Sequence, residues 1–527
     1  MVVATISPIA GHKVCAVRAR TVGRRYAAGL GTAGVLLLGA VSGCSGAAAG
    51  NDPAPPRLAA PVRSATVLAD HTPEALAAAV ARRLYASAPA AVVAPADDRT
   101  AQRRAAADAV QRRVPMLLVG AGGSAARHTV GAELRRLHAR TVLAVGQHAA
   151  GAVRAALGSA AGGVTVRTDP ADVPVTHPRR DLSRSTVLVH AGGDAATVAG
   201  ATAAGATGRA AGAAVVAVHG DDPRGDAGAL AALAHRDPAS VLAAGGSFGP
   251  ADRLADRLAV AVTGRQLPGG GQLMFPGRRL VALYGHPGTP VLGALGAQGL
   301  SASIARARKV ARPYRTGGVP VVPTFEIIAT TAQGSPGPDG QYSAVSSVAD
   351  LSDWVHRAGA AGMYVVLDLQ PGRADLLDQA KRYAPLLAEP YVGLALDPEW
   401  KLAAGQRPLE QIGTVDAGEI NRVSGWLSGL TARHHLPQKL LVLHQFQLSM
   451  IGHEDRLDTG HDNLAMLIHM DGQGSPSLKD ETWAGVTAAA PDGVRLGWKN
   501  FYTKDHPMLT PAQTLAKRPT PDMISYQ

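Results

Sequence analysis

The chain has 527 residues, of which 46% are hydrophobic, 17% charged and 4% aromatic, and its formal net charge is +12. This length favours two or three domains, each with its own core, over a single compact one. No basic run is interleaved with aromatic residues, so no nucleic-acid partner is expected. All five tryptophans lie after position 350, which indicates that the second half carries the chemistry.

The first 44 residues have the features of an export signal. They contain five basic residues and no acidic one, and an apolar stretch of 15 residues at 27–41 precedes Val-Ser-Gly-Cys44. That stretch is shorter than the ~20 residues of a membrane-spanning helix. Arg24 and Arg25 leave twin-arginine export as an alternative.

Val-Ser-Gly-Cys44 resembles the lipobox of bacterial lipoproteins. The resemblance implies that Cys44 is lipidated and becomes the first residue after cleavage. The protein is then expected to be anchored in the cell membrane by its lipid, on the extracellular side facing the cell wall. Loss of the five basic residues lowers the formal charge from +12 to +7, which suits an anionic lipid or wall-polymer surface.

Residues 45–63, small, polar and proline-rich, are predicted to form a disordered tether. Cys15 lies in the segment that would be removed, so the mature chain would keep Cys44 alone. Neither a disulfide nor a thiolate metal site is therefore expected.

Residues 64–263 alternate short β-branched runs with alanine-rich stretches, a pattern typical of a parallel sheet covered by helices. The expected strands are ATVLA, AAVVAP, PMLLVG and TVLAVG, then TVLVHA, AVVAVHG and SVLAAGG. The spacing repeats, because Met116 precedes Val142 by 26 positions and Val215 precedes Val241 by 26, and the two pairs are 99 positions apart. The repetition predicts a gene duplication.

This succession of an alanine-rich helix, PMLLVG, ELRRLHA, TVLAVG and AGAVRAAL resembles the cell wall-binding repeat 2 family, over about 90–160 and again over 186–262. The resemblance implies a wall-associated module that holds anionic wall polymer. Two copies are visible where the family has three in tandem. The alternative is a scaffold that only packs against the second half of the chain.

Residues 264–279 are rich in glycine and proline and are predicted to link this domain to a second one at 280–527. Eight strand-like runs follow: RLVALY (279–284), PVVPTFEI (320–327), MYVVLDL (363–369), YVGLALD (391–397), KLLVLHQF (439–446), LAMLIHM (464–470), VRLGW (494–498) and MISYQ (523–527). Helical segments separate most of them, and the one at 419–430 has an apolar stripe and a predicted capping box at 416–419. The fold class is therefore α/β, with a parallel α/β repeat domain followed by a (β/α)8 barrel that lacks its last helix. An open doubly wound sheet is the alternative.

Polar residues stand at the carboxyl ends of all eight runs, where a barrel of this kind carries its active site. They are Tyr284, His286, Glu326, Asp368, Asp397, Glu399, His444, Gln445, His469, Asp471, Lys499 and Tyr526. A structural role explains any one of them, such as an ion pair between Glu326 and Lys499. A full ring of such residues favours a functional site, because buried charges are costly.

Carboxylates with nearby tryptophans favour glycoside cleavage. Glu399 is predicted to be the general acid and base, since burial against Trp400 and proximity to Asp397 would raise its pKa. Asp397 lies two positions away on the same predicted strand, so its side chain is expected to point in the same direction as that of Glu399 and to orient the Glu399 carboxyl. Glu326 and Asp368 are both candidates for the second catalytic carboxylate.

The stretch LALDPE also resembles the Asp-x-Glu motif of family 25 lysozymes, which are barrels that cut peptidoglycan, and the resemblance implies that Glu399 is the acid and Asp397 its neighbour. The strand-one aspartate of that family is missing from ALYGHPGT, so the likeness serves as an analogy. The expected partner is a wall or other extracellular polysaccharide. Tyr284, His286, Trp400, His444, Gln445, His469, Asp471, Lys499 and Tyr526 are expected to bind it.

Two other classes of protein remain open. His286, His444, His469 and Asp471 are ligand types for a divalent metal and resemble the histidines of amidohydrolase-type barrels, although His286 stands alone where that family has a His-x-His pair. A non-catalytic lipoprotein that grips glycan is the second alternative. The primary hypothesis, a carboxylate hydrolase, needs neither cofactor nor metal.

Overall fold

The computed structural model of the chain describes residues 54–61, 64–120, 124–158, 163–237 and 240–527. Cys44 and the predicted signal lie outside the described residues. Arg57 and Leu58, at the end of the predicted tether, form the short strand β1 and pair with β3. Within the described ranges, no helix combines the length and the apolar character needed to cross a bilayer.

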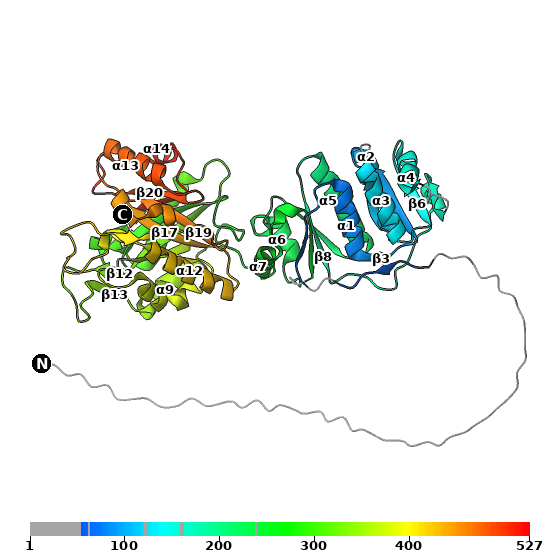
Figure 1. Ribbon diagram of the computed structural model, residues 1–527. Helices are drawn as coiled ribbons and strands as arrows, with labels where there is room; N and C mark the ends of the chain where they lie inside the picture. The colour runs from blue at the N-terminus through cyan, green and yellow to red at the C-terminus, as the bar shows by residue number, and fades with distance from the viewer. Residues whose placement is uncertain (1–53, 62–63, 121–123, 159–162, 238–239) are drawn as a thin grey trace, which may run out of the picture. The chain divides into compact units, whose positions relative to one another are not determined.

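The first part of the chain forms two four-stranded sheets whose strands are all parallel (Figure 1). Its strands are β1 (Arg57–Leu58), β2 (Thr66–Leu68), β3 (Tyr85–Ser87), β4 (Ala90–Pro95), β5 (Met116–Val119), β6 (Thr141–Ala144), β7 (Thr165–Arg167), β8 (Thr186–His190), β9 (Ala214–Val218) and β10 (Val241–Ala244). Its helices are α1 (Pro73–Leu84), α2 (Arg99–Arg112), α3 (Ser124–Arg136), α4 (Ala149–Leu157), α5 (Ala195–Ala210), α6 (Ala227–Leu233) and α7 (Ala251–Ala261). All seven strands expected here are present.

The two sheets share one strand order. One sheet runs β5-β4-β6-β7 and the other β9-β8-β10-β2. The fourth position is taken by β7, which follows β6 in the chain, in the first sheet, and by β2, which precedes the other three strands in the chain, in the second. Helix α5 contacts strands of both sheets. Its Thr207 hydroxyl bonds the backbone of Met116 on β5, accepting from N at 3.1 Å and donating to O at 3.2 Å. Small residues along α5 allow this close packing.

The second part forms a closed barrel of eight parallel strands, in the order β11, β12, β14, β15, β17, β19, β20 and β21, with β21 pairing back to β11. The strands are β11 (Arg279–Gly285), β12 (Val321–Ala332), β14 (Tyr364–Leu369), β15 (Val392–Leu396), β17 (Lys439–Gln445), β19 (Leu464–Met470), β20 (Arg495–Asn500) and β21 (Met523–Tyr526). The short strands outside the ring are β13 (Ser343–Val345), β16 (Val415–Asp416) and β18 (Ile451–Gly452). The predicted TIM-type barrel is thus confirmed, with each strand at its predicted place.

Helices cover the outside of the barrel, as Figure 1 shows for α9, α12 and α13. The helices of this part are α8 (Leu300–Ala311), α9 (Val348–Ala360), α10 (Leu376–Arg382), α11 (Ala384–Leu387), α12 (Ala417–Arg433), α13 (Pro476–Ala489) and α14 (Pro511–Leu515). The stripe predicted on α12 is confirmed, since Ile420, Val423, Leu427 and Leu430 are buried. The predicted capping box is only half formed. Asp416 caps the helix by accepting from Gly418 N, but Glu419 binds Lys401 Nζ at 2.7 Å instead.

Alternation along the strands separates an inner from an outer apolar layer. Inward residues, including Leu280, Val366 and Val442, form one cluster inside the barrel. Across the interior, the hydroxyl of Tyr364 on β14 accepts a hydrogen bond from Leu440 N on β17 at 3.2 Å, although β15 lies between these two strands in the sheet. The interior of the barrel is therefore a packed core, and a cavity opens at the carboxyl ends of its strands.

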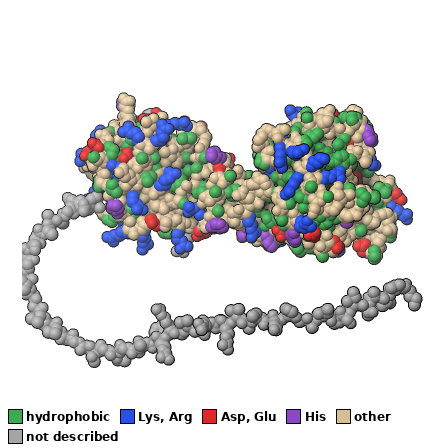
Figure 2. Space-filling view, turned by 180° about the vertical axis from the view of Figure 1, so that it is seen from behind, with side chains coloured by type: hydrophobic (Ala, Val, Ile, Leu, Met, Phe, Trp, Pro, Cys, Tyr) green, Lys and Arg blue, Asp and Glu red, His purple; other side chains and the backbone are tan. Residues whose placement is uncertain are grey.

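Surface charge is mixed. The face drawn in Figure 2 carries lysine and arginine side chains on both parts of the chain, with acidic side chains among them. This mixture agrees with the moderate excess of basic residues in the sequence.

Candidate functional site

One inward position on each strand, or directly after it in the case of β15, forms a polar layer above the apolar interior. These positions continue the inward alternation of the apolar cluster toward the carboxyl ends. The layer consists of Tyr284, Glu326, Asp368, Asp397, His444, His469, Lys499 and Ser525. All eight are buried, so this layer is the floor of the site.

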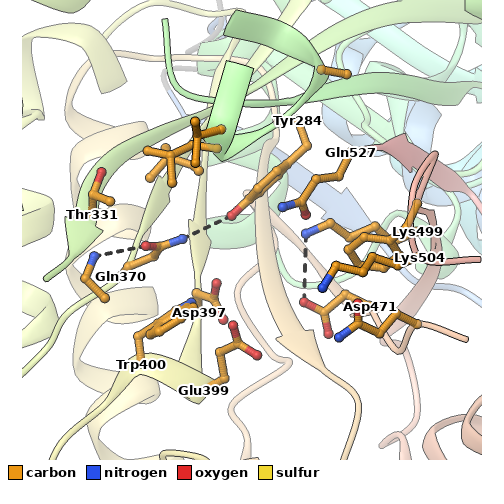
Figure 3. Close-up of a pocket in the computed structure, with 18 of the residues that line it drawn as sticks. Tyr284, Thr331, Gln370, Asp397, Glu399, Trp400, Asp471, Lys499, Lys504 and Gln527 are labelled. Carbon is orange, nitrogen blue, oxygen red and sulfur yellow. Dashed lines mark hydrogen bonds and ion pairs between the residues drawn. The ribbon is translucent and has the colours of Figure 1, made fainter. Parts of the chain in front are cut away.

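A cavity of about 990 Å³ opens above the floor. Six of the predicted site residues line it: Tyr284, Asp397, Glu399, Trp400, Asp471 and Lys499 (Figure 3). Figure 3 shows Asp397, Glu399 and Trp400 on one side, facing Asp471 and Lys499 on the other. The volume is sufficient for a few sugar rings.

Glu399 reaches the cavity by a different route from the predicted one, whereas Asp397 continues the inward alternation of β15 as predicted. Strand β15 ends at Leu396, and Glu399 lies in a single 3-10 turn, Pro398–Trp400, rather than in an extended strand. Gly413 supports this turn by donating its N–H to Glu399 O at 2.8 Å. A Cβ at Gly413 would lie 2.3 Å from Lys401 O and 2.5 Å from Pro398 O, so only glycine fits.

His444 is the centre of the buried floor. Its Nδ1 lies 3.0 Å from Asp471 Oδ2 and its Nε2 lies 3.0 Å from Glu326 Oε1. Asp368 Oδ1 is 3.9 Å from the same Nε2. On the other side of Asp368, Tyr284 donates its hydroxyl to Oδ2 at 2.8 Å. One imidazole thus links carboxylates from three strands.

The charges around His444 determine its protonation. Burial alone lowers the pKa of His444, but the charge of Glu326 and the hydrogen bonds to Asp471 and Glu326 raise the pKa well above its ordinary value. The pKa of Asp368 is raised to about 6, mainly by burial. The pKa of His469 is lowered well below its ordinary value, by burial and then by the charges of His444 and Lys499. His444 is therefore the imidazolium and His469 the neutral imidazole.

The two cavity-lining carboxyl groups Glu399 and Asp471 differ in protonation. The pKa of Glu399 is raised to about 7, by burial and then by the charge of Asp471. The pKa of Asp471 is lowered, because its hydrogen bond to His444 and the charges of His444 and Lys499 together outweigh the effect of its burial. The pKa of Asp397 is raised well above its ordinary value by burial and the charge of Glu399. Near neutral pH one side of the cavity offers a protonated carboxyl and the other a carboxylate.

Lys499 lies between these groups and the aromatic floor. Its ammonium is 4.0 Å from Asp471 Oδ2 and 3.6 Å from the centroid of the Tyr284 ring. The cation stabilises the ionised form of Asp471 and is itself stabilised by the ring face.

Three predicted site residues belong neither to the cavity lining nor to the floor beneath it. Gln445 and Tyr526 are one position out of register with the inward residues. Gln445 donates to Glu454 Oε2 at 2.7 Å, and the hydroxyl of Tyr526 lies 2.5 Å from that of Tyr314 in the outer layer. His286 follows β11 and uses Nδ1 toward Pro287 O and Nε2 toward Ser346 Oγ. Glu326, Asp368, His444 and His469 do not line the cavity either, but lie beneath it in the floor.

Some residues of the site were not found from the sequence. Gln370 lies two positions after Asp368, so the spacing that singled out Asp397 and Glu399 also identifies it. It donates to the Tyr284 hydroxyl at 3.3 Å and lines the cavity. Ser525, whose hydroxyl is 2.7 Å from His469 Nε2, could have been found from the alternation of β21.

Gly497 shapes the floor beside His469. A Cβ there would lie 2.1 Å from His469 Nδ1, so glycine gives the imidazole its room. In the described part of the chain, no group of three or more histidine, cysteine, aspartate or glutamate side chains is arranged to hold a metal ion. Comparisons with protein-family models and with curated protein sequences gave no match.

Proposed function

We propose that the barrel hydrolyses a glycosidic bond of an extracellular or wall polysaccharide. The observation that carries the proposal is the pair Glu399 and Asp471, which line one cavity with pKa values moved in opposite directions. Glycoside cleavage requires one carboxyl that donates a proton and one that is ionised. Two carboxyl groups whose surroundings separate their pKa values satisfy this requirement.

In the proposed mechanism Glu399 donates its proton to the oxygen of the leaving sugar. The positive charge that develops at the anomeric carbon is stabilised by the carboxylate of Asp471. Asp471 then either attacks that carbon or takes a proton from the attacking water. In the first case water later releases the sugar with Glu399 acting as base, and in the second the reaction ends in one step.

The surrounding residues set the protonation of this pair. The hydrogen bond to His444 and the charges of His444 and Lys499 lower the pKa of Asp471, and burial together with the negative charge of Asp471 raises that of Glu399. Asp397 is buried beside Glu399 and positions it. The pKa of Asp397 is itself raised by burial and by the charge of Glu399. Asp471 therefore replaces Glu326 and Asp368 as the favoured second carboxylate, because those two lie beneath the cavity with their oxygens directed to His444 and Tyr284.

The proposal extends to the location of the protein. Cys44 and the segment before it support a lipid anchor on the outer side of the cell membrane, and the strand pattern of the first part supports binding of anionic wall polymer. Metabolic labelling with a fatty-acid probe tests the anchor. Label that persists after Cys44→Ala would contradict it.

The hydrolase is tested by incubating the purified protein with isolated wall polysaccharide and measuring new reducing ends. We expect release by the natural protein and none by Glu399→Gln, which keeps the size of the side chain but cannot donate a proton as an acid. Glycan binding without turnover in either form would instead favour a non-catalytic glycan-binding protein.

A further inference from the structure

The rim of the cavity carries its positive charge in one sector. Arg306 on α8 and Lys504 in the loop after β20 line the cavity together with Tyr502. In the barrel, β20, β21 and β11 are consecutive neighbours, so these side chains come from adjoining parts of the rim. The carboxyl groups of Asp397 and Glu399 come from the region after β15, half-way around the ring.

A second hollow adjoins this sector. It has a volume of about 540 Å³, shares Arg306 and Tyr502 with the main cavity, and is also lined by Lys309. A chain that leaves the main cavity on this side would therefore pass Arg306, Lys309 and the tyrosine ring.

Among the described residues, the basic groups of this sector have no carboxylate partner. Arg306 donates to Ala294 O at 3.2 Å and to Gln298 Oε1 at 2.9 Å, both neutral acceptors. Its guanidinium carbon lies 5.1 Å from the centroid of the Tyr502 ring, which holds it in place. Within the residues that the structure describes, neither Arg306, Lys309 nor Lys504 has a carboxylate within 4.0 Å. Lys504 projects toward the cavity (Figure 3).

We propose that this basic sector, defined by Arg306, Lys309, Lys504 and Tyr502, binds an oxyanion carried by the glycan. The inference rests on the proposed function and narrows its substrate class to anionic polysaccharide, with a carboxylate on the sugar or a phosphate in the chain. A guanidinium held in place by a ring and by neutral acceptors can offer its remaining N–H groups to two oxygens at once. The basic sector lies at the rim near β20, β21 and β11, whereas the proposed acid Glu399 follows β15, so an oxyanion bound in the sector also fixes the direction in which the chain lies.

The test uses the full chain with Glu399→Gln, so that no probe is consumed, and measures binding by calorimetry. The probes are a uronic-acid oligosaccharide, the same oligosaccharide with its carboxyl groups reduced to alcohols, and a glycerol-phosphate oligomer. The perturbed protein also carries Arg306→Gln, Lys309→Gln and Lys504→Gln. The control carries Arg308→Gln, which removes one charge from the same helix outside both hollows.

We expect at least one charged probe to bind about tenfold more tightly than the reduced oligosaccharide, the size of one charge-assisted hydrogen bond. The advantage should disappear in the triple variant, remain in the control and weaken with salt. Preference for the uronic-acid probe identifies a carboxylate, and preference for the glycerol-phosphate probe identifies a phosphate. Equal binding of charged and reduced probes, no binding of either charged probe, or an unchanged triple variant would overturn the inference.

Turnover by the natural protein separates this inference from the proposed function. If neutral and charged glycans are cleaved with equal kcat/KM, the proposed hydrolase activity is supported and the proposed anion site is refuted. If charge-dependent binding is found but no glycan is cleaved, the anion site is supported as a binding site and the proposed hydrolase activity is refuted.

Discussion

The protonation of Glu399 gives the most direct test of the proposed chemistry. A glutamate with the ordinary pKa of 4.5 is protonated in only about 0.3% of molecules at pH 7, whereas a pKa of about 7 leaves about half of them protonated. The surroundings of Glu399 thus increase the population of competent acid by about 150-fold. An acid must be protonated to act, so activity should be full below pH 7 and fall above it. On the other side, activity should fall only below about pH 3.8, the ordinary pKa of an aspartate, because that of Asp471 is lowered.

Glu399→Gln removes this acid. The expected loss in kcat/KM is about 10²–10⁴-fold for a methyl glycoside, whose leaving group needs the proton. The 4-nitrophenyl glycoside of the same sugar has a leaving group that departs without help, so its loss should be much smaller. The alkaline limb of the pH profile should also disappear with that substrate, because the group that titrates there is gone.

The assay compares both glycosides with the natural protein, Glu399→Gln and Glu410→Gln. Glu410 lines the same cavity from an exposed position, so its substitution makes the same chemical change without removing the proposed acid. Equal losses for the two leaving groups, or an alkaline limb that survives in Glu399→Gln, would refute the assignment of Glu399 as the acid.

Three further predictions concern the groups that surround the acid. Lys499→Gln should move the alkaline limb of the pH–rate profile to higher pH, because the cation lowers the pKa of Glu399; an unmoved or lowered limb would contradict this. His444→Gln should lower the free energy of unfolding in urea at pH 7 by about 3–5 kcal/mol, since it leaves buried carboxylates without their cation; a loss below about 1 kcal/mol would show that the imidazolium is not needed there. Gly413→Ala should reduce kcat/KM by about 10²-fold through displacement of the turn that carries Glu399, whereas Gly485→Ala, at a helical site with open space, serves as its control and should leave it unchanged.

Much of the barrel could be predicted from the sequence, because its strands are short apolar runs bounded by polar and turn residues. The run at 439–446 is an example. Its continuous apolar residues are typical of a parallel strand covered on both faces, and the structure shows that strand β17 is buried along its whole length. The predicted helix at 419–430 was found for a similar reason, namely the spacing of Ile420, Val423 and Leu427. The capping box did not form because Glu419 Oε1 accepts from Lys401 Nζ, 18 residues away in the sequence, and from the backbone N–H of Leu376 instead of from its own N-cap.

Two residues were wrongly predicted to line the site because they were chosen for lying at the end of a strand, without asking whether their side chains point into the barrel. On β17 the inward residues are Leu440, Val442 and His444, so Gln445 had to point outward. The same rule selects Ser525 instead of Tyr526. Both could have been decided from the sequence by asking which residues share a face with the apolar interior.

What no local pattern could provide is the protonation of the site. The pKa of Glu399 depends on the charge of Asp471, which depends on His444, which is held by Glu326 on a strand more than a hundred residues earlier. Each step of that chain of interactions crosses from one strand to another, so it exists only once the barrel has closed. The sequence placed acids at the strand ends, but the closed ring decides which of them keeps its proton. Loss of His444 from the buried floor should therefore change the pH dependence of activity, because Asp471, which lines the cavity, loses the hydrogen bond and the charge that lower its pKa.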